Sequence, residues 1–203
     1  MKNGKIIIID GTVGSAKTTC ILGVSTSARL GYKYPCIAAE GYPVAGEAIR
    51  AALANLRLRG IDPFSDFDVL FDLILEISVD MYQKASERDI TFFERGIPYL
   101  KLLADYFGYT IGNKYYEYCE IYKYSSPIFV FAPIISFDLT SPVPGDEPRK
   151  IYTLEQRLSE HDKVMRIYKT LGYNVIEVPV FTEEDIAENS IKRISMIKEC
   201  LKL

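Results

Sequence analysis

Residues 5–24 read KIIIIDGTVGSAKTTCILGV, and the interpretation of the whole chain begins with this stretch. Four consecutive isoleucines, at positions 6–9, form the short apolar run typical of a strand buried on both faces. A turn containing Gly11 and Gly14 follows, and a helical pattern starts at Lys17. The stretch therefore predicts a buried strand, a tight turn and a helix in direct succession.

The turn has the spacing of a phosphate-binding loop, in which Gly, four residues and Gly-Lys-Ser/Thr separate a strand from a helix. In such a loop the main-chain N–H groups surround a phosphate, the lysine reaches the outer phosphates, and the hydroxyl holds magnesium. The helix also directs the positive end of its dipole at the anion. We therefore expect ATP and Mg²⁺ to bind at Gly11, Thr12, Val13, Gly14, Ser15, Ala16, Lys17, Thr18 and Thr19.

One position departs from the pattern, because Ala16 stands where glycine is usual. Its methyl group matters little if the residue is right-handed helical, but costs roughly 1 kcal/mol or more if φ is positive. The alternatives to a working site are a chance glycine turn and a degenerate loop that no longer binds nucleotide.

Composition limits the class of protein. The 203 residues suit one sizeable core, and a net charge of -3 does not favour general binding to nucleic acid or anionic membrane. The four cysteines are scattered without metal-ligand spacing, which suits a reducing compartment. The first apolar run is too short for a signal peptide or a membrane span, so we expect a cytoplasmic protein.

Apolar runs alternate with helical patterns along the whole chain. This alternation predicts a parallel sheet covered by helices on both faces, within a single domain over residues 1–203. The expected strands are residues 6–9, 34–39, 90–96, 127–133 and 174–179. The expected helices are residues 17–30, 45–59, 62–81, 97–107, 114–124, 153–172 and a last one from 182.

Polar side chains follow several of these strands. Ligands of a parallel sheet bind at the carboxyl ends of its strands, so these ends should share one crevice. Glu40 follows the second expected strand, and Glu94 and Arg95 close the third. We expect them to lie near Lys17 and Thr18.

The segments IIIIDGTVGSAKTT, AAEGYP, FFERGIPYLKLLADYFG, FVFAP and DEPRKIYTLEQRLSEHDKVMRIYKTLGYNVIEVPV resemble, in this order, a family of small predicted ATPases with an AAA-like domain. The chain is also similar to deoxynucleoside kinases, although Gly96 stands where those kinases have serine. The resemblance implies a three-layer α/β/α fold with five parallel strands in the order 2-3-1-4-5. It is weak over residues 42–88 and 109–125, which would hold the substrate.

The resemblance also implies roles for individual residues. Glu40 would accept a proton from an acceptor hydroxyl, Glu94 would hold magnesium together with Thr18, and Arg95 would face the transferring phosphate. Residues 138–157 would form a short lid that places Arg149 and Arg157 over the phosphates.

These roles predict a P-loop phosphotransferase that moves the γ-phosphate of ATP to a small acceptor such as a nucleoside or nucleotide. One alternative is an ATPase or nucleotide-dependent switch that acts on a protein partner, and another is a nucleotide-binding module without turnover. The five tyrosines of residues 115–124 fit an amphipathic helix with exposed phenols or the face of a homodimer.

Overall fold

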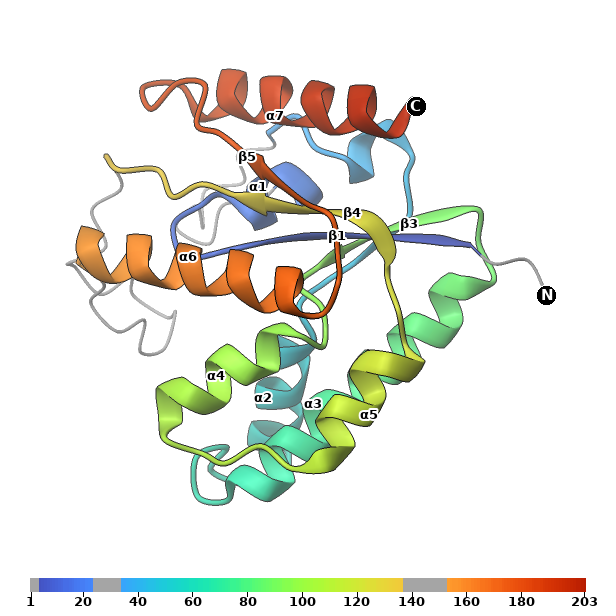
Figure 1. The fold of residues 1–203 in the computed structure, drawn as a ribbon, viewed down its shortest axis with the longest axis vertical. Helices are drawn as coiled ribbons and strands as arrows, with labels where there is room; N and C mark the ends of the chain where they lie inside the picture. The colour runs from blue at the N-terminus through green and yellow to red at the C-terminus, as the bar shows by residue number, and fades with distance from the viewer. Residues whose placement is uncertain (1–3, 24–33, 137–152) are drawn as a thin grey trace.

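The computed structural model describes residues 4–23, 34–136 and 153–203 of the chain (Figure 1). Its strands are β1 Lys5–Gly11, β2 Val44–Ala45, β3 Ile90–Glu94, β4 Ser125–Phe131 and β5 Val175–Val178. Its α-helices are α1 Lys17–Leu22, α2 Ala48–Leu58, α3 Phe67–Ser86, α4 Tyr99–Phe107, α5 Asn113–Ile121, α6 Leu154–Thr170 and α7 Ile186–Leu201, and a short 3-10 helix, η1, covers Ala38–Glu40.

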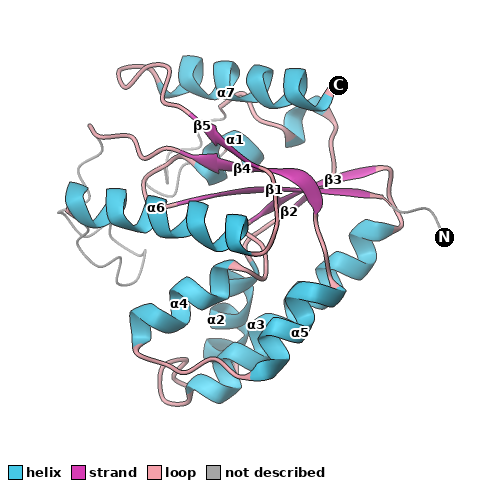
Figure 2. Cartoon of the chain, in the orientation of Figure 1, coloured by secondary structure: helices cyan, strands magenta, loops and turns pink. Residues whose placement is uncertain are grey.

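The strands form one parallel sheet in the order β2-β3-β1-β4-β5, which confirms the predicted topology (Figure 2). The register places Ile7 opposite Phe92 of β3 and Ile9 opposite Phe129 of β4. Because β1 lies at the centre, the loop that follows it emerges between the ends of β3 and β4.

Helices cover both faces of the sheet and give three layers, as predicted (Figure 1). Side chains of a strand alternate between faces, so Ile7 and Ile9 join one core with α1 and α7. Ile6 and Ile8 join the other core, against α2 to α6. Each of the four isoleucines is at most 2% exposed, and full burial of such a side chain stabilises a fold by roughly 1.5–3 kcal/mol.

The second strand lies later in the chain than predicted. Residues 34–37 contain no strand, residues 38–40 form η1, and β2 is the two-residue segment Val44–Ala45. This segment pairs with β3 at the sheet edge, where Pro43 contributes only its carbonyl, as acceptor for the Phe92 N–H. The apolar residues Cys36 and Ile37 are buried without belonging to the sheet.

Helix boundaries also differ from the expectations. The helix expected over 45–59 begins at Ala48, because Ala45 belongs to β2, and the last helix, expected from 182, begins at Ile186 after its cap Asp185. Gly23, with φ 70°, follows α1, and residues 24–30 of the expected helix lie outside the described residues. The helix expected from Asp62 begins at Phe67, because Asp66 caps it by accepting from the Val69 N–H. The capping box predicted for Thr153 and Gln156 is present at the start of α6.

Within the described ranges, no helix is long and apolar enough to span a membrane.

Candidate functional site

The phosphate-binding loop, residues 11–18, runs from the last residue of β1 into the start of α1 and is fixed by close approaches and by left-handed backbone. Gly11 has φ 140°, and a side chain on it would place its Cβ 2.6 Å from the Phe131 carbonyl oxygen of β4. Gly14 has φ 76°, and its carbonyl accepts from the Ile134 N–H, which ties the loop to the segment after β4. Only glycine fits the first position, so the loop has the tight form that its sequence predicts.

Ala16 occupies the left-handed region, with φ 59° and ψ 28°. A non-glycine residue pays about 1–2 kcal/mol for this conformation, because its Cβ approaches the following carbonyl. Alanine in place of the usual glycine therefore strains the backbone of the loop at the residue directly before α1.

The Lys17 ammonium lies inside the loop. Its Nζ donates to the Gly11 carbonyl at 2.7 Å and to the Thr12 carbonyl at 2.8 Å, and lies 3.2 Å from the Ser15 hydroxyl. Burial lowers the pKa of Lys17 to about 8, and the charge of Arg95 acts in the same direction. A bound phosphate would give this ammonium an anionic partner in place of neutral carbonyls.

Thr18 and Glu94 come together as predicted for a metal pair. The Thr18 hydroxyl donates to Glu94 Oε1 at 2.7 Å, from the start of α1 to the end of β3. Burial and the nearby carboxylate of Glu47 raise the pKa of Glu94. Oxygen ligands in this number suit Mg²⁺, which commonly takes one or two protein groups besides phosphates and water. Among the described residues, no cluster of three carboxylate, thiol or imidazole groups could hold a metal alone.

Glu40 does not lie at a strand end, which corrects its expected position. It belongs to η1, and its Oε2 accepts from the exposed Lys198 of α7 at 2.7 Å. The carboxylate that follows β2 is Glu47, two residues beyond Ala45. Its Oε1 lies 2.9 Å from Nε of Arg95, and the side chain is 11% exposed. Burial raises the pKa of Glu47, but Arg95 and Arg50 outweigh it and leave the pKa below its usual range.

Arg95 stands at the centre of the site, with φ 66°. Its Nη1 lies 3.3 Å from Asp10 Oδ1, and its guanidinium carbon lies 3.6 Å from the centre of the Tyr99 ring. The contact of Nε with Glu47 is an ion pair without well-aligned hydrogen-bond geometry. Two carboxylates and one aromatic face thus hold a side chain that is 8% exposed. Left-handed backbone costs a non-glycine residue about 1–2 kcal/mol, so these contacts hold Arg95 in a strained conformation.

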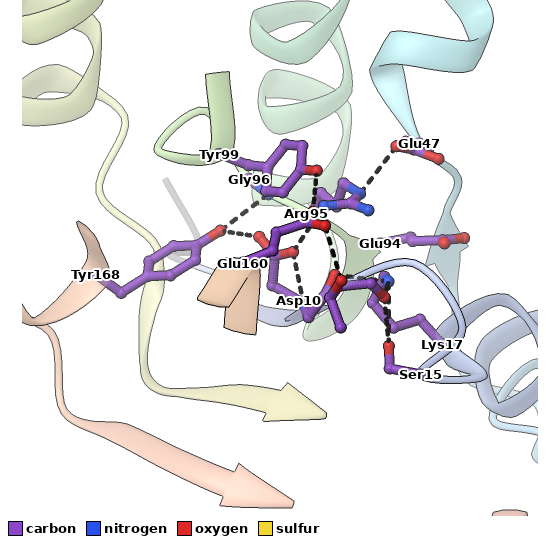
Figure 3. A network of polar contacts seen from close by, with 12 residues as sticks. Asp10, Ser15, Lys17, Glu47, Glu94, Arg95, Gly96, Tyr99, Glu160 and Tyr168 are labelled. Atoms are coloured by element: carbon purple, nitrogen blue, oxygen red, sulfur yellow. Dashed lines mark hydrogen bonds and ion pairs between the residues drawn. The ribbon is translucent and has the colours of Figure 1, made fainter. Parts of the chain in front are cut away.

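A buried polar network links the loop to this arginine (Figure 3). Glu160 of α6 accepts from the Thr12 hydroxyl and from the Tyr99 hydroxyl, each at 2.8 Å. Each carboxylate oxygen therefore holds a different element, the phosphate-binding loop on one side and α4 on the other. The side chains that connect the loop to Arg95 are all shielded from solvent.

Asp10 forms the second branch of the network. Its Oδ2 accepts from the Tyr168 hydroxyl at 2.7 Å, and its Oδ1 accepts from the Gly11 N–H at 2.7 Å (Figure 3). The Tyr168 oxygen in turn accepts from the Gly96 N–H. Burial raises the pKa of Asp10, although Arg95 and Lys17 oppose this effect.

The sequence profile of the AAA domain family matches residues 6–188 of the chain, which include the phosphate-binding loop, Arg95 and the buried network around it. The chain belongs to the AAA domain family. No curated protein matches the sequence.

Solved structures resemble this AAA domain in fold. NadR protein, in a crystal structure in complex with NR, aligns with 96% of the chain at 17% identity and a TM-score of 0.57. The chain spans about half of that protein, 51% of its length. Thymidylate kinase from Ehrlichia chaffeensis aligns over 98% of this chain and 99% of its own, at 16% identity and a TM-score of 0.51. The AAA domain therefore has the P-loop fold that these proteins share.

The expected lid contains two arginines, and the structure describes one of them. Arg149 lies outside the described residues, as do residues 138–152 of the lid. Arg157 is 3% exposed, and its Nη1 and Nη2 donate to the carbonyls of Ile134 and Ile135. It holds the segment after β4 with both terminal nitrogens, and its place over the phosphates stays a prediction.

Arg193 of α7 is a site residue that the sequence did not reveal. It is fully buried, and its three nitrogens donate to the carbonyls of Ser15 at 2.5 Å, Pro179 at 2.9 Å and Ala132 at 2.9 Å. It thereby supports the loop of this AAA domain from the opposite side to Glu160. Nothing near position 193 in the sequence signals this contact, which spans 178 residues.

A narrow recess opens beside the carboxylates. Residues 46–49, α3, the end of β3 and α4 line it, and its volume is about 20 Å³, which is room for roughly one water molecule. Glu47, Glu94 and Arg95 all line it, and Glu94 also contacts Thr18 of the loop. Residues 42–88, where the resemblance to the known families is weak, therefore supply part of the wall of this recess.

Proposed function

We propose that this AAA domain is an ATP-dependent phosphotransferase that moves the γ-phosphate of ATP to the hydroxyl of a small acceptor. The observation that carries the proposal is the group Glu47, Glu94 and Arg95 beside the phosphate-binding loop, joined by the contacts of Glu94 with Thr18 and of Glu47 with Arg95. A kinase needs a base for its acceptor hydroxyl besides a metal ligand, and Glu47 is a second carboxylate available for this task.

The residues of the site fit the tasks of phosphoryl transfer, which are mostly positioning and neutralisation of charge. Lys17 and the N–H groups of residues 11–18 would hold the phosphates. Thr18 and Glu94 would hold magnesium, which neutralises phosphate charge when bound. Glu47, kept ionised by Arg95 and Arg50, would orient the acceptor hydroxyl and take its proton.

Arg95 would meet the charge that develops on the transferring group, because it lies between Glu47 and Asp10. In the described conformation these carboxylates hold the guanidinium, so a bound phosphate would compete with them. The fixed ring of Tyr99 limits where the guanidinium can move.

The test is incubation of the protein with ATP, magnesium and a pooled metabolite extract, followed by mass spectrometry. We expect one new phosphorylated species, formed in parallel with ADP, and none with Lys17→Ala. ATP consumption without any phosphorylated product would instead support the alternative, a nucleotide-dependent switch that acts on a protein. Binding of ATP without consumption would support a module that lacks turnover.

A further inference from the structure

We propose that Tyr168 of α6 is a positioning residue for phosphoryl transfer, which fixes Arg95 through the Asp10 carboxylate and through the Gly96 N–H. The inference rests on the proposed function, because it concerns how Arg95 is held ready to face the transferring phosphate. The Tyr168 hydroxyl binds one group that pairs with the guanidinium and one group of the main chain directly after Arg95 (Figure 3).

The two hydrogen bonds of this hydroxyl have fixed directions. Tyr168 is fully buried, donates to Asp10 Oδ2 at 2.7 Å and accepts from the Gly96 N–H at 3.2 Å. Burial and the adjacent Asp10 carboxylate raise the pKa of Tyr168 well above its usual value, so its oxygen keeps the proton that it donates. A single side chain of α6 therefore joins the carboxylate beneath Arg95 to the turn that carries Arg95.

Asp10 passes the position of this hydroxyl on to the guanidinium. Its Oδ1 lies 3.3 Å from Nη1 of Arg95 and accepts from the Gly11 N–H at 2.7 Å, whereas its Oδ2 accepts from Tyr168. Without the phenol, Oδ2 of this fully buried carboxylate loses its donor. A buried carboxylate that lacks a donor turns toward other partners, and the guanidinium that it holds moves with it.

The turn after β3 depends on tyrosine hydroxyls because its backbone is strained. Arg95 has φ 66°, and the next two N–H groups donate to phenols: Gly96 to Tyr168 at 3.2 Å and Ile97 to Tyr124 at 3.1 Å. A strained backbone conformation persists only where its surroundings hold it. Loss of one of these acceptors therefore lets the turn relax and displaces the side chain of Arg95.

The glycine at position 96 makes room for the same two tyrosines. A Cβ on Gly96 would lie 2.8 Å from Tyr124 Cε2 and 3.2 Å from the Tyr168 oxygen. The backbone of Gly96 is not left-handed, so glycine is needed for space and not for its conformation. This close packing gives a physical reason for glycine where the deoxynucleoside kinases have serine.

The test compares two buried tyrosines that each lose only a hydroxyl. Tyr168→Phe removes the clasp, whereas Tyr173→Phe removes a hydroxyl that accepts from the Tyr124 N–H at 3.2 Å, on a ring whose centre lies 5.9 Å from that of Tyr168. Single-turnover transfer is measured with γ-³²P-labelled ATP, magnesium and the pooled metabolite extract. We expect Tyr168→Phe to lower the rate at saturating ATP by roughly tenfold or more, and Tyr173→Phe to keep it.

ATP affinity separates a positioning role from general damage to the site. Lys17 keeps its contacts with the Gly11 and Thr12 carbonyls in both variants. We therefore expect the Kd for ATP and magnesium, measured by calorimetry, to stay within about threefold of the parent value in both. A rate that falls at unchanged affinity reports an interaction that matters in the transition state.

A spectroscopic measurement follows Arg95 without any acceptor. The ¹H–¹⁵N signal of its Nε–H is assigned by its absence in Arg95→Lys. Because the guanidinium carbon lies 3.6 Å from the centre of the Tyr99 ring, a displacement of the guanidinium changes the ring-current shift of this signal. We expect the signal to shift or broaden in Tyr168→Phe and to stay in place in Tyr173→Phe.

A second pair of variants serves if Tyr168→Phe does not fold. Gly96→Ala presses a methyl group against both tyrosines, whereas Gly112→Ala adds a methyl group where no atom lies within 4 Å. We expect only Gly96→Ala to lower the transfer rate and to shift the Arg95 signal.

The outcomes separate this inference from the proposed function. Parental transfer by Tyr168→Phe, or an equal loss in Tyr173→Phe, would overturn the role of Tyr168 and leave the phosphotransferase intact. A lower rate with an unchanged Arg95 signal would also overturn it, because the effect would not pass through Arg95. If the parent protein transfers phosphate to nothing in the extract, the proposed function fails. The Arg95 signal then judges the positioning alone: a shift in Tyr168→Phe supports it, and an unchanged signal overturns it.

Discussion

Ala16 holds a left-handed backbone that its own methyl group opposes, with φ 59° and ψ 28°. Replacement by glycine removes the steric conflict, and we expect Ala16→Gly to raise the free energy of unfolding by about 1 kcal/mol. Nucleotide affinity should be unchanged or higher, because the loop keeps its shape at lower cost. Urea denaturation and titration calorimetry with ATP and magnesium measure the two quantities.

The matched control is Ala54→Gly, at an exposed position inside α2. There the same change should lower the free energy of unfolding by about 1 kcal/mol, because glycine is a poor helix former. A marked loss of nucleotide affinity in Ala16→Gly would show that the methyl group contributes to binding.

Glu47 and Glu40 give a second matched pair, because only Glu47 lies in the recess. We expect Glu47→Gln to keep ATP affinity and to slow transfer by about 10²–10⁴, the usual worth of a positioned base. Glu40→Gln removes a contact with exposed Lys198 and should leave both quantities unchanged. Single-turnover rates of both variants test this prediction. Equal rates in Glu47→Gln and the parent protein would show that Glu47 takes no part in the transfer step.

The low pKa of Lys17, about 8, predicts a pH dependence of nucleotide binding. A bound phosphate raises this pKa, so affinity should be steady below pH 8 and should fall as the pH rises past about 8, where the free protein loses the ammonium proton. Calorimetry near pH 9 in buffers of different ionisation enthalpy should detect proton uptake on binding. Lys17→Ala should lose most affinity, and a pH slope that survives in it would assign the effect to another group.

Helix α7 stabilises the loop through one buried side chain, since Arg193 donates to the Ser15, Pro179 and Ala132 carbonyls. Burial lowers its pKa to about 10, so it stays charged near neutral pH. Arg193→Met keeps much of the apolar stem but leaves these carbonyls unpaired, and we expect a loss of about 3–5 kcal/mol in the free energy of unfolding. Lys192→Met, next to it and paired with Glu188 at the surface, should change stability by less than about 0.5 kcal/mol. Urea denaturation of both variants provides the comparison, and similar losses would contradict a special role for Arg193.

Local patterns predicted the elements whose signals are strong and contiguous. Four strands, the capping box at Thr153 and the phosphate-binding loop all have such signals, and the structure contains them. The second strand was misplaced because the apolar residues 36–39 look like a strand, whereas β2 has two residues and is defined only by pairing with β3. The same misplacement led the sequence analysis to Glu40, whereas the carboxylate that follows β2 is Glu47.

Contacts between distant parts of the chain had no local signal. Glu160 meets Thr12 across 148 positions, and Tyr168 meets Asp10 across 158. On their own helices both look like ordinary residues of an amphipathic pattern. Their roles come from the sheet order, which brings α6 against β1 and the loop that follows it.

The path Thr12–Glu160–Tyr99–Arg95 joins the phosphate-binding loop to the guanidinium of Arg95, and it predicts that the ring and the hydroxyl of Tyr99 have separable effects. Tyr99→Phe keeps the ring that holds Arg95 and removes one hydrogen bond to the buried Glu160 carboxylate. We expect it to lower the free energy of unfolding by about 1–3 kcal/mol and to keep most of the transfer rate.

Tyr99→Leu removes the hydroxyl and the ring together, so Arg95 loses the surface that fixes its guanidinium. We expect a larger loss of stability, because a buried ring is lost as well. The transfer rate should be lower than that of Tyr99→Phe by roughly tenfold, because small displacements of a charged group weaken its contact with the transition state. Urea denaturation and single-turnover rates at saturating ATP measure both effects. Equal rates in the two variants would mean that the ring only fills space, and that Arg95 is held well enough by Glu47 and Asp10 alone.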